Sequence, residues 1–220
     1  MRLTQAYLAL YNAAQAVGWA TAFGSLVYGF IQEQSNEQIY DRAAPLIGWL
    51  QFASLLETVH AALGLVPSSP LSALMQWGGR SNCLFCVVQP IRALHSDVYA
   101  LVMLGCWSAA ETIRYPQYAA ATLGACPGWL TWMRYTMFIP LFPLGTMAEM
   151  GLMAAALPDL ARRRPYSLDL PNKWNFAFHY HTFIQILLFL YPLLWWQLYS
   201  QLLRARSKKL GGASKSAKKD

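Results

Sequence analysis

Charged residues are scarce in this 220-residue chain. Asp, Glu, Lys and Arg make up 12% of it and hydrophobic residues 56%, whereas a soluble globular domain has roughly 25% charged residues. Negatively charged residues are scarcer than positively charged ones, with 10 Asp and Glu against 17 Lys and Arg. The composition argues against an ordinary soluble domain and indicates a membrane protein, and the length suits a single domain.

The positive charge is not spread over a basic face, as nucleic-acid binding would require. Seven of the 17 Lys and Arg follow Leu203, in "RARSKKLGGASKSAKKD". We interpret residues 204–220 as a solvated cytoplasmic tail that can contact anionic lipid, and we expect no nucleic-acid partner. Residues 1–203 then form the membrane domain.

Cysteine and the common catalytic motifs are also sparse. Four cysteines, which we expect to pack as small apolar side chains, are present at Cys83, Cys86, Cys106 and Cys126. "CVVQPIR" (86–92) has the Cys-x5-Arg spacing of tyrosine phosphatases but lacks a glycine-rich cradle for phosphate. "CLFC" (83–86) and "HYH" (179–181) lack the paired spacing of a zinc site. No phosphate loop, nucleotide fingerprint or serine nucleophile elbow is visible.

Long apolar stretches, by contrast, are abundant. Stretches near the roughly 20 residues that cross a bilayer recur at 6–31, 44–65, 71–92, 97–115, 127–157 and 177–203. We therefore predict an all-α, polytopic membrane protein: a six-transmembrane-helix bundle with both termini on one side. The first stretch is too long for a signal-peptide core and is interpreted as a retained span.

Two basic clusters indicate opposite orientations of this bundle in the membrane. The tail favours cytoplasmic termini under the positive-inside rule. Arg162, Arg163, Arg164 and Lys173 would then lie on the opposite side. We follow the larger tail cluster and predict cytoplasmic termini.

Several polar or charged residues fall inside or at the edges of these apolar stretches: Glu57, Gln76, Arg80, Glu111, Arg114, Arg134 and Glu149. A charged group at mid-membrane costs about 2.5–3.5 kcal/mol on insertion scales, so these groups should face inward. They would form either structural ion pairs or a polar pocket for a charged substrate, and we favour the pocket.

Helical spacing places some of these residues on shared faces. Gln76 and Arg80 are four residues apart, and Phe142 and Glu149 are two turns apart. Pro140, Pro143 and Gly145 should kink the helix near them or open its hydrogen-bond ladder.

Five segments, in this order and spacing, resemble a known family. They are "LLETVHAALGLVPSS" with Glu57, "QWGGR" with Gln76 and Arg80, "WSAAETIRYPQY" with Glu111 and Arg114, "RYTMFIPLFPLGTMAE" with Glu149, and "LPNKWNFAFHYH". The chain resembles, nearly end to end, the very-long-chain (3R)-3-hydroxyacyl-CoA dehydratases, once called protein-tyrosine-phosphatase-like proteins.

The resemblance implies a fold, an activity and a location. The fold is a six-span bundle with cytoplasmic termini in the endoplasmic reticulum membrane. The activity is a lyase step of fatty-acid elongation, the removal of water from a 3-hydroxyacyl-CoA to give the trans-2-enoyl-CoA. The partners would be acyl-CoA, the lipid bilayer and other elongase subunits. No metal or redox cofactor is implied, because dehydration moves only protons and water.

The family's catalytic pair is a tyrosine and a glutamate in the pattern Tyr-Pro-x-Gly-x-x-x-Glu. Here the pattern is "FPLGTMAE", so Glu149 is present, Gly145 is in place, and Phe142 occupies the tyrosine position. The resemblance implies that Arg80 and Arg134 hold the thioester region, the phosphopantetheine or Glu149. Gln76, Glu57, Glu111 and Arg114 would support the site.

Phe142 leaves the activity open, because phenylalanine cannot transfer a proton. A replacement hydroxyl would have to come from another position, with Tyr99, Tyr115, Tyr180 and Thr146 as the candidates. The alternative is a catalytically impaired paralogue that binds acyl-CoA or elongase subunits as a scaffold or regulator. A small transporter or channel is a third interpretation.

Overall fold

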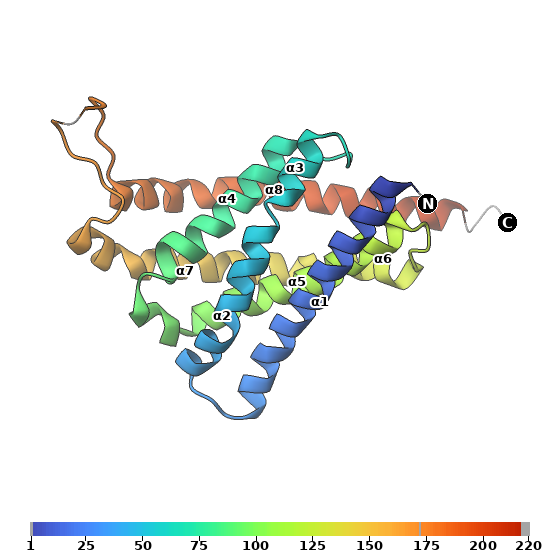
Figure 1. Ribbon diagram of the computed structural model, residues 1–220, viewed down its shortest axis with the longest axis horizontal. Helices are drawn as coiled ribbons and strands as arrows, with labels where there is room; N and C mark the ends of the chain where they lie inside the picture. The colour runs from blue at the N-terminus through green and yellow to red at the C-terminus, as the bar shows by residue number, and fades with distance from the viewer. Residues whose placement is uncertain (1, 172, 217–220) are drawn as a thin grey trace.

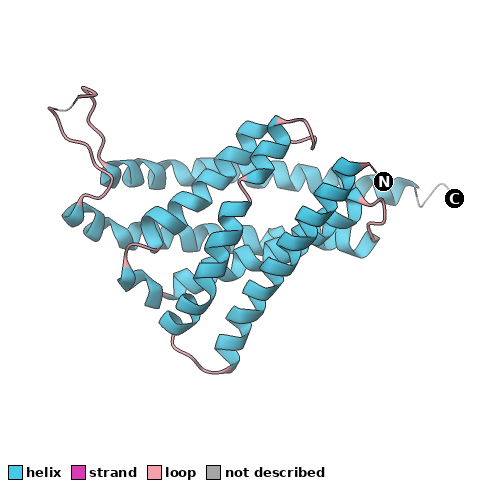
Figure 2. Cartoon of the chain, viewed as in Figure 1, coloured by secondary structure: helices cyan, strands magenta, loops and turns pink. Residues whose placement is uncertain are grey.

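The chain forms an all-helical bundle, as Figures 1 and 2 show. The computed structural model describes residues 2–171 and 173–216. Within that part, the only β-like feature is a single bridge between Leu168 and Phe178. The elements are α1 (Leu3–Ile31), α2 (Asn36–Ala53), α3 (Leu56–Ala62), α4 (Pro70–Ser81), the π-helix η1 (Asn82–Val88), the 3₁₀-helix η2 (Arg92–Ser96), α5 (Val98–Thr122), α6 (Gly128–Arg134), α7 (Phe138–Arg163) and α8 (Tyr180–Ser216).

Local capping residues set where three of these helices begin. Ser35 caps α2 by accepting from the backbone of Gln38, whose side chain in turn accepts from the Ser35 backbone. Ser69 caps α4, and Pro70 follows in the first turn, where a missing N–H costs nothing. Asp97 caps α5 through Tyr99 N. The connectors are therefore specified locally.

Helix α5 lies at the centre of the packing. It packs against α1 on one side and α7 on the other, while α2 packs mainly on α1. Large buried side chains from these helices form one core cluster: Trp19, Ile39, Ile47, Leu84, Met103, Leu104, Leu152 and Leu160. This arrangement fixes the face of α7 that meets α5.

The six predicted apolar stretches fall largely in helical structure, but three of them, 44–65, 71–92 and 127–157, are not continuous helices. The stretch 44–65 is divided between α2 and α3, which are separated at Ser54 and Leu55, and 71–92 is divided between α4, η1 and the start of η2. A π-helical turn of this kind commonly lies beside a functional site. Near the prolines, the interruption falls between α6 and α7, and Pro140 lies in the first turn of α7, where proline is tolerated.

In the part of the chain that the structure describes, two helical segments are long and apolar enough to cross a membrane, Gly128–Arg163 and Tyr180–Leu210. These helices fit a membrane protein, whereas the full six-span bundle stays a prediction. Helices α3 and α4, with 7 and 12 residues, are each too short to cross a bilayer. Many large hydrophobic side chains are nevertheless exposed, including Leu10, Trp49, Phe189, Leu193 and Trp196, as expected of a surface that meets lipid.

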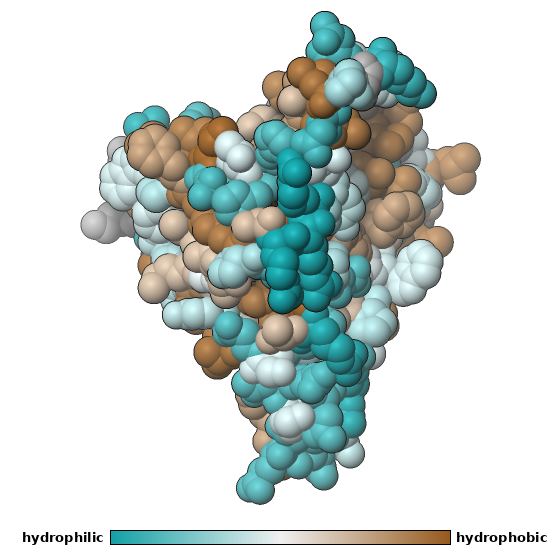
Figure 3. All heavy atoms as spheres, turned by 90° about the vertical axis from the view of Figure 1, so that its left-hand side faces the viewer, coloured by the Kyte–Doolittle hydropathy of each residue, from teal (hydrophilic) through white to brown (hydrophobic). Residues whose placement is uncertain are grey.

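Both ends of the chain lie at one end of the molecule. In Figure 1, α1 begins near the end of α8, and the α7–α8 loop projects at the opposite end. Figure 3 faces that opposite end and shows a hydrophilic band down its middle with hydrophobic residues on both sides. The predicted basic tail begins inside α8, which continues to Ser216, and residues 217–220 lie outside the described part.

Candidate functional site

Glu149 is a buried carboxyl group held by two donors from different helices. It lies in the middle of α7 and is 8% exposed. Nε1 of Trp107 on α5 donates to its Oε1 at 2.8 Å, and the hydroxyl of Tyr191 on α8 donates to its Oε2. A carboxyl group buried in this way must be hydrogen-bonded to be tolerated. Its two oxygens are thus fixed in direction by three helices.

A small residue on α7 allows α5 to approach Glu149. Gly145 lies one turn before Glu149, and a Cβ atom added there would be 3.2 Å from Cβ of Cys106. That separation is tighter than ordinary van der Waals contact, so a larger residue would push α5 away. Trp107 follows Cys106 on α5, and the close approach at Gly145 therefore keeps the indole within reach of Glu149.

Helix α8 runs antiparallel to α7 (Figure 1) and, after α7 and α5, is the third helix that contributes to the site around Glu149. Two turns before Glu149, the ring of Phe142 stacks against Trp195 and Tyr199, with interplanar angles of 13° and 1°. Tyr199 in turn stacks on Trp195 at 4.9 Å between ring centroids. Phe142 is thus part of an aromatic stack between the two helices, about 10.5 Å along α7 from Glu149.

Four of the predicted polar residues meet in one ion-pair network beside the site. Glu111, which is 4% exposed, accepts from Arg80 Nη1 and from Arg114 Nε, both at 2.5 Å. Arg114 also donates through its two terminal nitrogens to Glu57 at 2.8 and 2.9 Å. Tyr115 donates to Glu57 as well. The network joins α3, α4 and α5, and its formal charges cancel.

Arg80 connects this network to Glu149. Its guanidinium carbon lies 4.7 Å from the centroid of the Trp107 ring, a cation–π arrangement, and Nε1 of the same indole donates to Glu149. The same indole therefore holds the carboxyl with its N–H edge and the arginine with its face. An anionic intermediate formed beside Glu149 would have a cation within electrostatic range.

Two predicted residues lie outside this arrangement. Gln76 is exposed on α4, one turn before Arg80. Arg134, at the end of α6, lies 5.9 Å from the ring centroid of Tyr118 and 6.0 Å from that of Tyr135. In the described contacts, neither residue reaches Glu149.

Sequence reasoning missed Trp107 and Tyr191. Trp107 precedes Glu111 by one helical turn, so it shares a face with a residue that had been singled out. Tyr191 lies near the middle of the predicted last span, rather than at its end where interfacial aromatics gather. A phenol at that depth needs a hydrogen-bond partner, and this requirement could have drawn attention to it.

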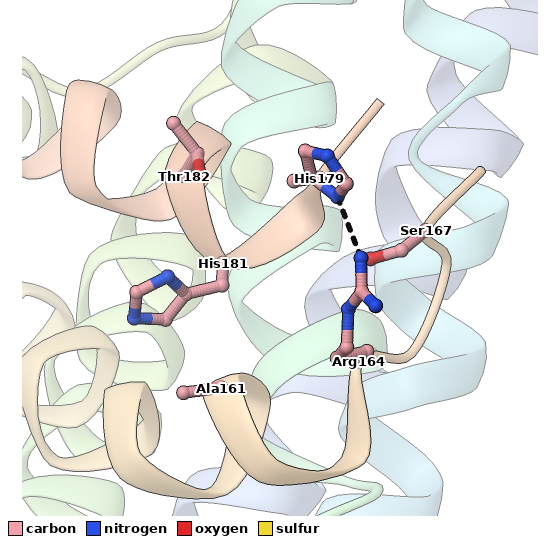
Figure 4. Close-up of a pocket in the computed structure, with 6 residues that line it drawn as sticks. All are labelled: Ala161, Arg164, Ser167, His179, His181 and Thr182. Atoms are coloured by element: carbon pink, nitrogen blue, oxygen red, sulfur yellow. Dashed lines mark hydrogen bonds between the residues drawn. The ribbon is translucent and has the colours of Figure 1, made fainter. Parts of the chain in front are cut away.

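A separate hollow of about 260 Å³ lies at the α7–α8 loop and is lined by Arg164, Ser167, His179 and His181 (Figure 4). Arg164 Nη2 lies 3.2 Å from Nδ1 of His179 and 2.7 Å from Oδ1 of Asp169. Along α7, Arg164 is about 22 Å from Glu149. In the described part of the chain, no group of three or more His, Cys, Asp or Glu residues is arranged to hold a metal ion.

Comparisons with known proteins agree with one another. The family described as "Protein tyrosine phosphatase-like protein, PTPLA" matches residues 51–212. Very-long-chain (3R)-3-hydroxyacyl-CoA dehydratase 2 of Mus musculus is 34% identical over 205 residues, which cover 93% of this chain and 81% of the relative. Dehydratase 1 of the same species is 31% identical over 218 residues, covering 99% and 78%.

A plant relative gives the same result. Very-long-chain (3R)-3-hydroxyacyl-CoA dehydratase PASTICCINO 2B of Oryza sativa subsp. japonica is 34% identical over 175 residues, covering 79% of each chain. No solved structure matches.

Proposed function

The chain belongs to the protein tyrosine phosphatase-like family, PTPLA, and we propose that it is a very-long-chain (3R)-3-hydroxyacyl-CoA dehydratase. In this role it removes water from a 3-hydroxyacyl-CoA and releases the trans-2-enoyl-CoA during fatty-acid elongation. Its dehydratase relatives, which match over most of their length, support the reaction class.

The single observation that carries the proposal is the buried carboxyl of Glu149 with its two donors, Trp107 and Tyr191. Dehydration requires one group to take the proton next to the thioester carbonyl and another to protonate the departing hydroxyl, each within roughly 2.6–3.2 Å of the reacting atom. Each carboxyl oxygen can accept more than one hydrogen bond. Glu149 can therefore keep both donors and still meet a substrate proton.

The charged network supports the site from one side. Arg80 lies between Glu111 and the face of Trp107, and we assign it to stabilising the negative charge that develops on the thioester oxygen. Glu57, Glu111 and Arg114 hold Arg80 and the surrounding helices in place. Arg134 and Gln76, which lie farther out, are assigned to the coenzyme A portion of the substrate.

The proposal includes the membrane setting. We place the chain in the endoplasmic reticulum as a six-span protein with cytoplasmic termini. The acyl chain would lie between helices in contact with lipid, and the coenzyme A phosphates would meet cationic residues at the membrane surface. Other elongase subunits are the expected protein partners.

One observation favours a second candidate, a catalytically impaired relative that binds acyl-CoA or elongase subunits. The ring of Phe142 lies against both Trp195 and Tyr199 and provides no hydroxyl for catalysis. Such a protein would keep the fold and the pocket without turnover.

An assay on the purified protein in detergent separates the two candidates. The parent, Glu149→Ala and Phe142→Tyr would each be given a 3-hydroxyacyl-CoA, and formation of the enoyl-CoA would be followed. Activity in the parent that Glu149→Ala abolishes supports the dehydratase. An inactive parent that Phe142→Tyr activates would establish the impaired relative instead. Glu37→Ala, an exposed carboxylate of α2, is the matched control and should match the parent.

A further inference from the structure

Dehydration needs a second proton-transfer group besides Glu149, and position 142 does not provide one. Phe142 has no hydroxyl, and its ring is fixed in the stack with Trp195 and Tyr199. General acid–base help contributes typically 10²–10⁴-fold, so an active enzyme must obtain its second group from elsewhere. The search for this second group rests on the proposed function.

The three phenols suggested by the sequence have their described contacts elsewhere. The fourth candidate, Thr146, is buried on α7 itself, three residues before Glu149, with no described hydrogen bond to it. Tyr115 donates to Glu57, and Tyr180 donates to Asn82 at 2.8 Å. Tyr99 lies at the start of α5, with its ring against Gly151. In the described contacts, none of these three phenols reaches Glu149.

Tyr191 is the phenol that does reach it. This residue comes from α8, a different helix from the one that carries Glu149, and its hydroxyl donates directly to Oε2. The opposite oxygen, Oε1, is held by Trp107. Tyr191 is partly exposed whereas Glu149 is buried, so the phenol lies on the side from which a ligand can approach.

We propose that Tyr191 is the general acid of this enzyme, replacing the family's tyrosine from the neighbouring helix. Glu149 takes the proton from the carbon next to the thioester carbonyl. Those electrons form the new carbon–carbon double bond, and the carbon–oxygen bond breaks. The single O–H of Tyr191 turns from Oε2 of Glu149 to the departing hydroxyl, which leaves as water with that proton.

The same hydrogen bond then restores the enzyme. After one turnover Glu149 carries the substrate's proton and Tyr191 is a phenolate. The contact between the phenol oxygen and Oε2 lets that proton return to Tyr191. No outside proton donor is needed, and the substrate has lost one water in total. Trp107 keeps the carboxyl oriented while the proton moves along its other side.

The test compares two substrates that differ only in the leaving group. The first is a 3-hydroxyacyl-CoA, whose hydroxyl must be protonated to leave. The second is the matching 3-chloroacyl-CoA, whose chloride leaves without a proton and needs only the base. The parent, Tyr191→Phe, Glu149→Gln and Trp107→Phe would be assayed with both, as purified proteins in detergent.

Tyr191→Phe keeps the ring and removes only the hydroxyl. We expect it to lose about 100-fold or more in kcat with the hydroxy substrate and to stay within a few-fold of the parent with the chloro substrate. Glu149→Gln should lose both reactions. Trp107→Phe, which weakens the positioning of Glu149 without removing an acid, should lower both reactions by the same factor.

Two results would overturn the proposal. Full activity of Tyr191→Phe with the hydroxy substrate would show that another group is the acid. An equal loss with both substrates would reduce Tyr191 to a positioning residue. Tyr28→Phe, at an exposed phenol on α1, is the matched control and should behave as the parent with both substrates. Thermal unfolding in detergent would confirm that each variant is folded.

Failure of the proposed function has a different signature. A parent that is inactive with the hydroxy substrate would overturn the dehydratase assignment and the role of Tyr191 with it. An active parent with an unaffected Tyr191→Phe variant would overturn only the role of Tyr191.

Discussion

Replacing Glu111 by glutamine should destabilise the protein more than any single change in its exposed ion pairs. Glu111 is almost fully buried and accepts from both Arg80 and Arg114. Glutamine has nearly the same shape but offers one acceptor oxygen and an NH₂ group. That NH₂ would face a guanidinium donor, and the network would change from neutral to one net positive charge.

The size of the effect follows from the burial. Removing one member of a buried ion pair costs about 3–5 kcal/mol, because the remaining charge is left uncompensated. For chains of this length, 1 kcal/mol corresponds to about 2–4 °C in Tm. The expected decrease for Glu111→Gln is therefore roughly 6–20 °C. Glu37, whose partner Arg92 is 71% exposed, belongs to the class of surface pairs worth about 0–1 kcal/mol.

The assay is thermal unfolding of the purified variants in one detergent. A double-mutant cycle with Arg80→Gln completes it, because removing both partners restores neutrality. We expect the double variant to be more stable than the two single losses predict when added, by about 0.5–3 kcal/mol. A Glu111→Gln variant no less stable than Glu37→Gln, or strictly additive losses, would refute the view that the network stabilises the fold through paired charges.

Three further outcomes are expected. Trp107→Phe removes one hydrogen bond to the carboxyl of Glu149, which is worth about 1.5–3 kcal/mol, and should lower kcat roughly 10- to 100-fold. The control Trp129→Phe, at a side chain that is 63% exposed, should leave kcat unchanged. Gly145→Leu should push α5 away from α7 and reduce kcat between about tenfold and 100-fold. Gly105→Leu, where an added Cβ has open space, should leave kcat near that of the parent. Equal losses at both glycines would contradict the argument that α5 approaches α7 closely at Gly145. Phe142→Tyr should change kcat less than about threefold in an active parent, because the ring at position 142 is held in the stack with Trp195 and Tyr199 and Tyr191 already supplies the acid; a large gain in the dehydration assay would contradict this.

The sequence predicted the fold class and much of the polar network for a physical reason. Charges in an apolar environment must pair, so the presence of Glu57, Arg80, Glu111 and Arg114 in apolar stretches implied that they would face inward. These four residues do pair with one another in the folded chain. Repeated apolar stretches likewise indicated helices before any coordinate was known.

Other features depend on packing that sequence spacing does not encode. The division of 44–65 between α2 and α3 occurs at ordinary helix-compatible residues. The meeting of Tyr191 with Glu149 depends on the register of α8 against α7, which the aromatic stack around Phe142 helps to set. Because partners in this site lie 42 residues apart, only the folded arrangement reveals them.

The position of α8 bears on how substrates of different length would be distinguished. This helix packs chiefly against α7, and most of its outer face is exposed. A hydrocarbon chain leaving the site beside Tyr191 would reach lipid after passing only α8. No closed cavity would then limit its length. Under the proposed function, we therefore expect turnover to depend little on the length of the acyl chain.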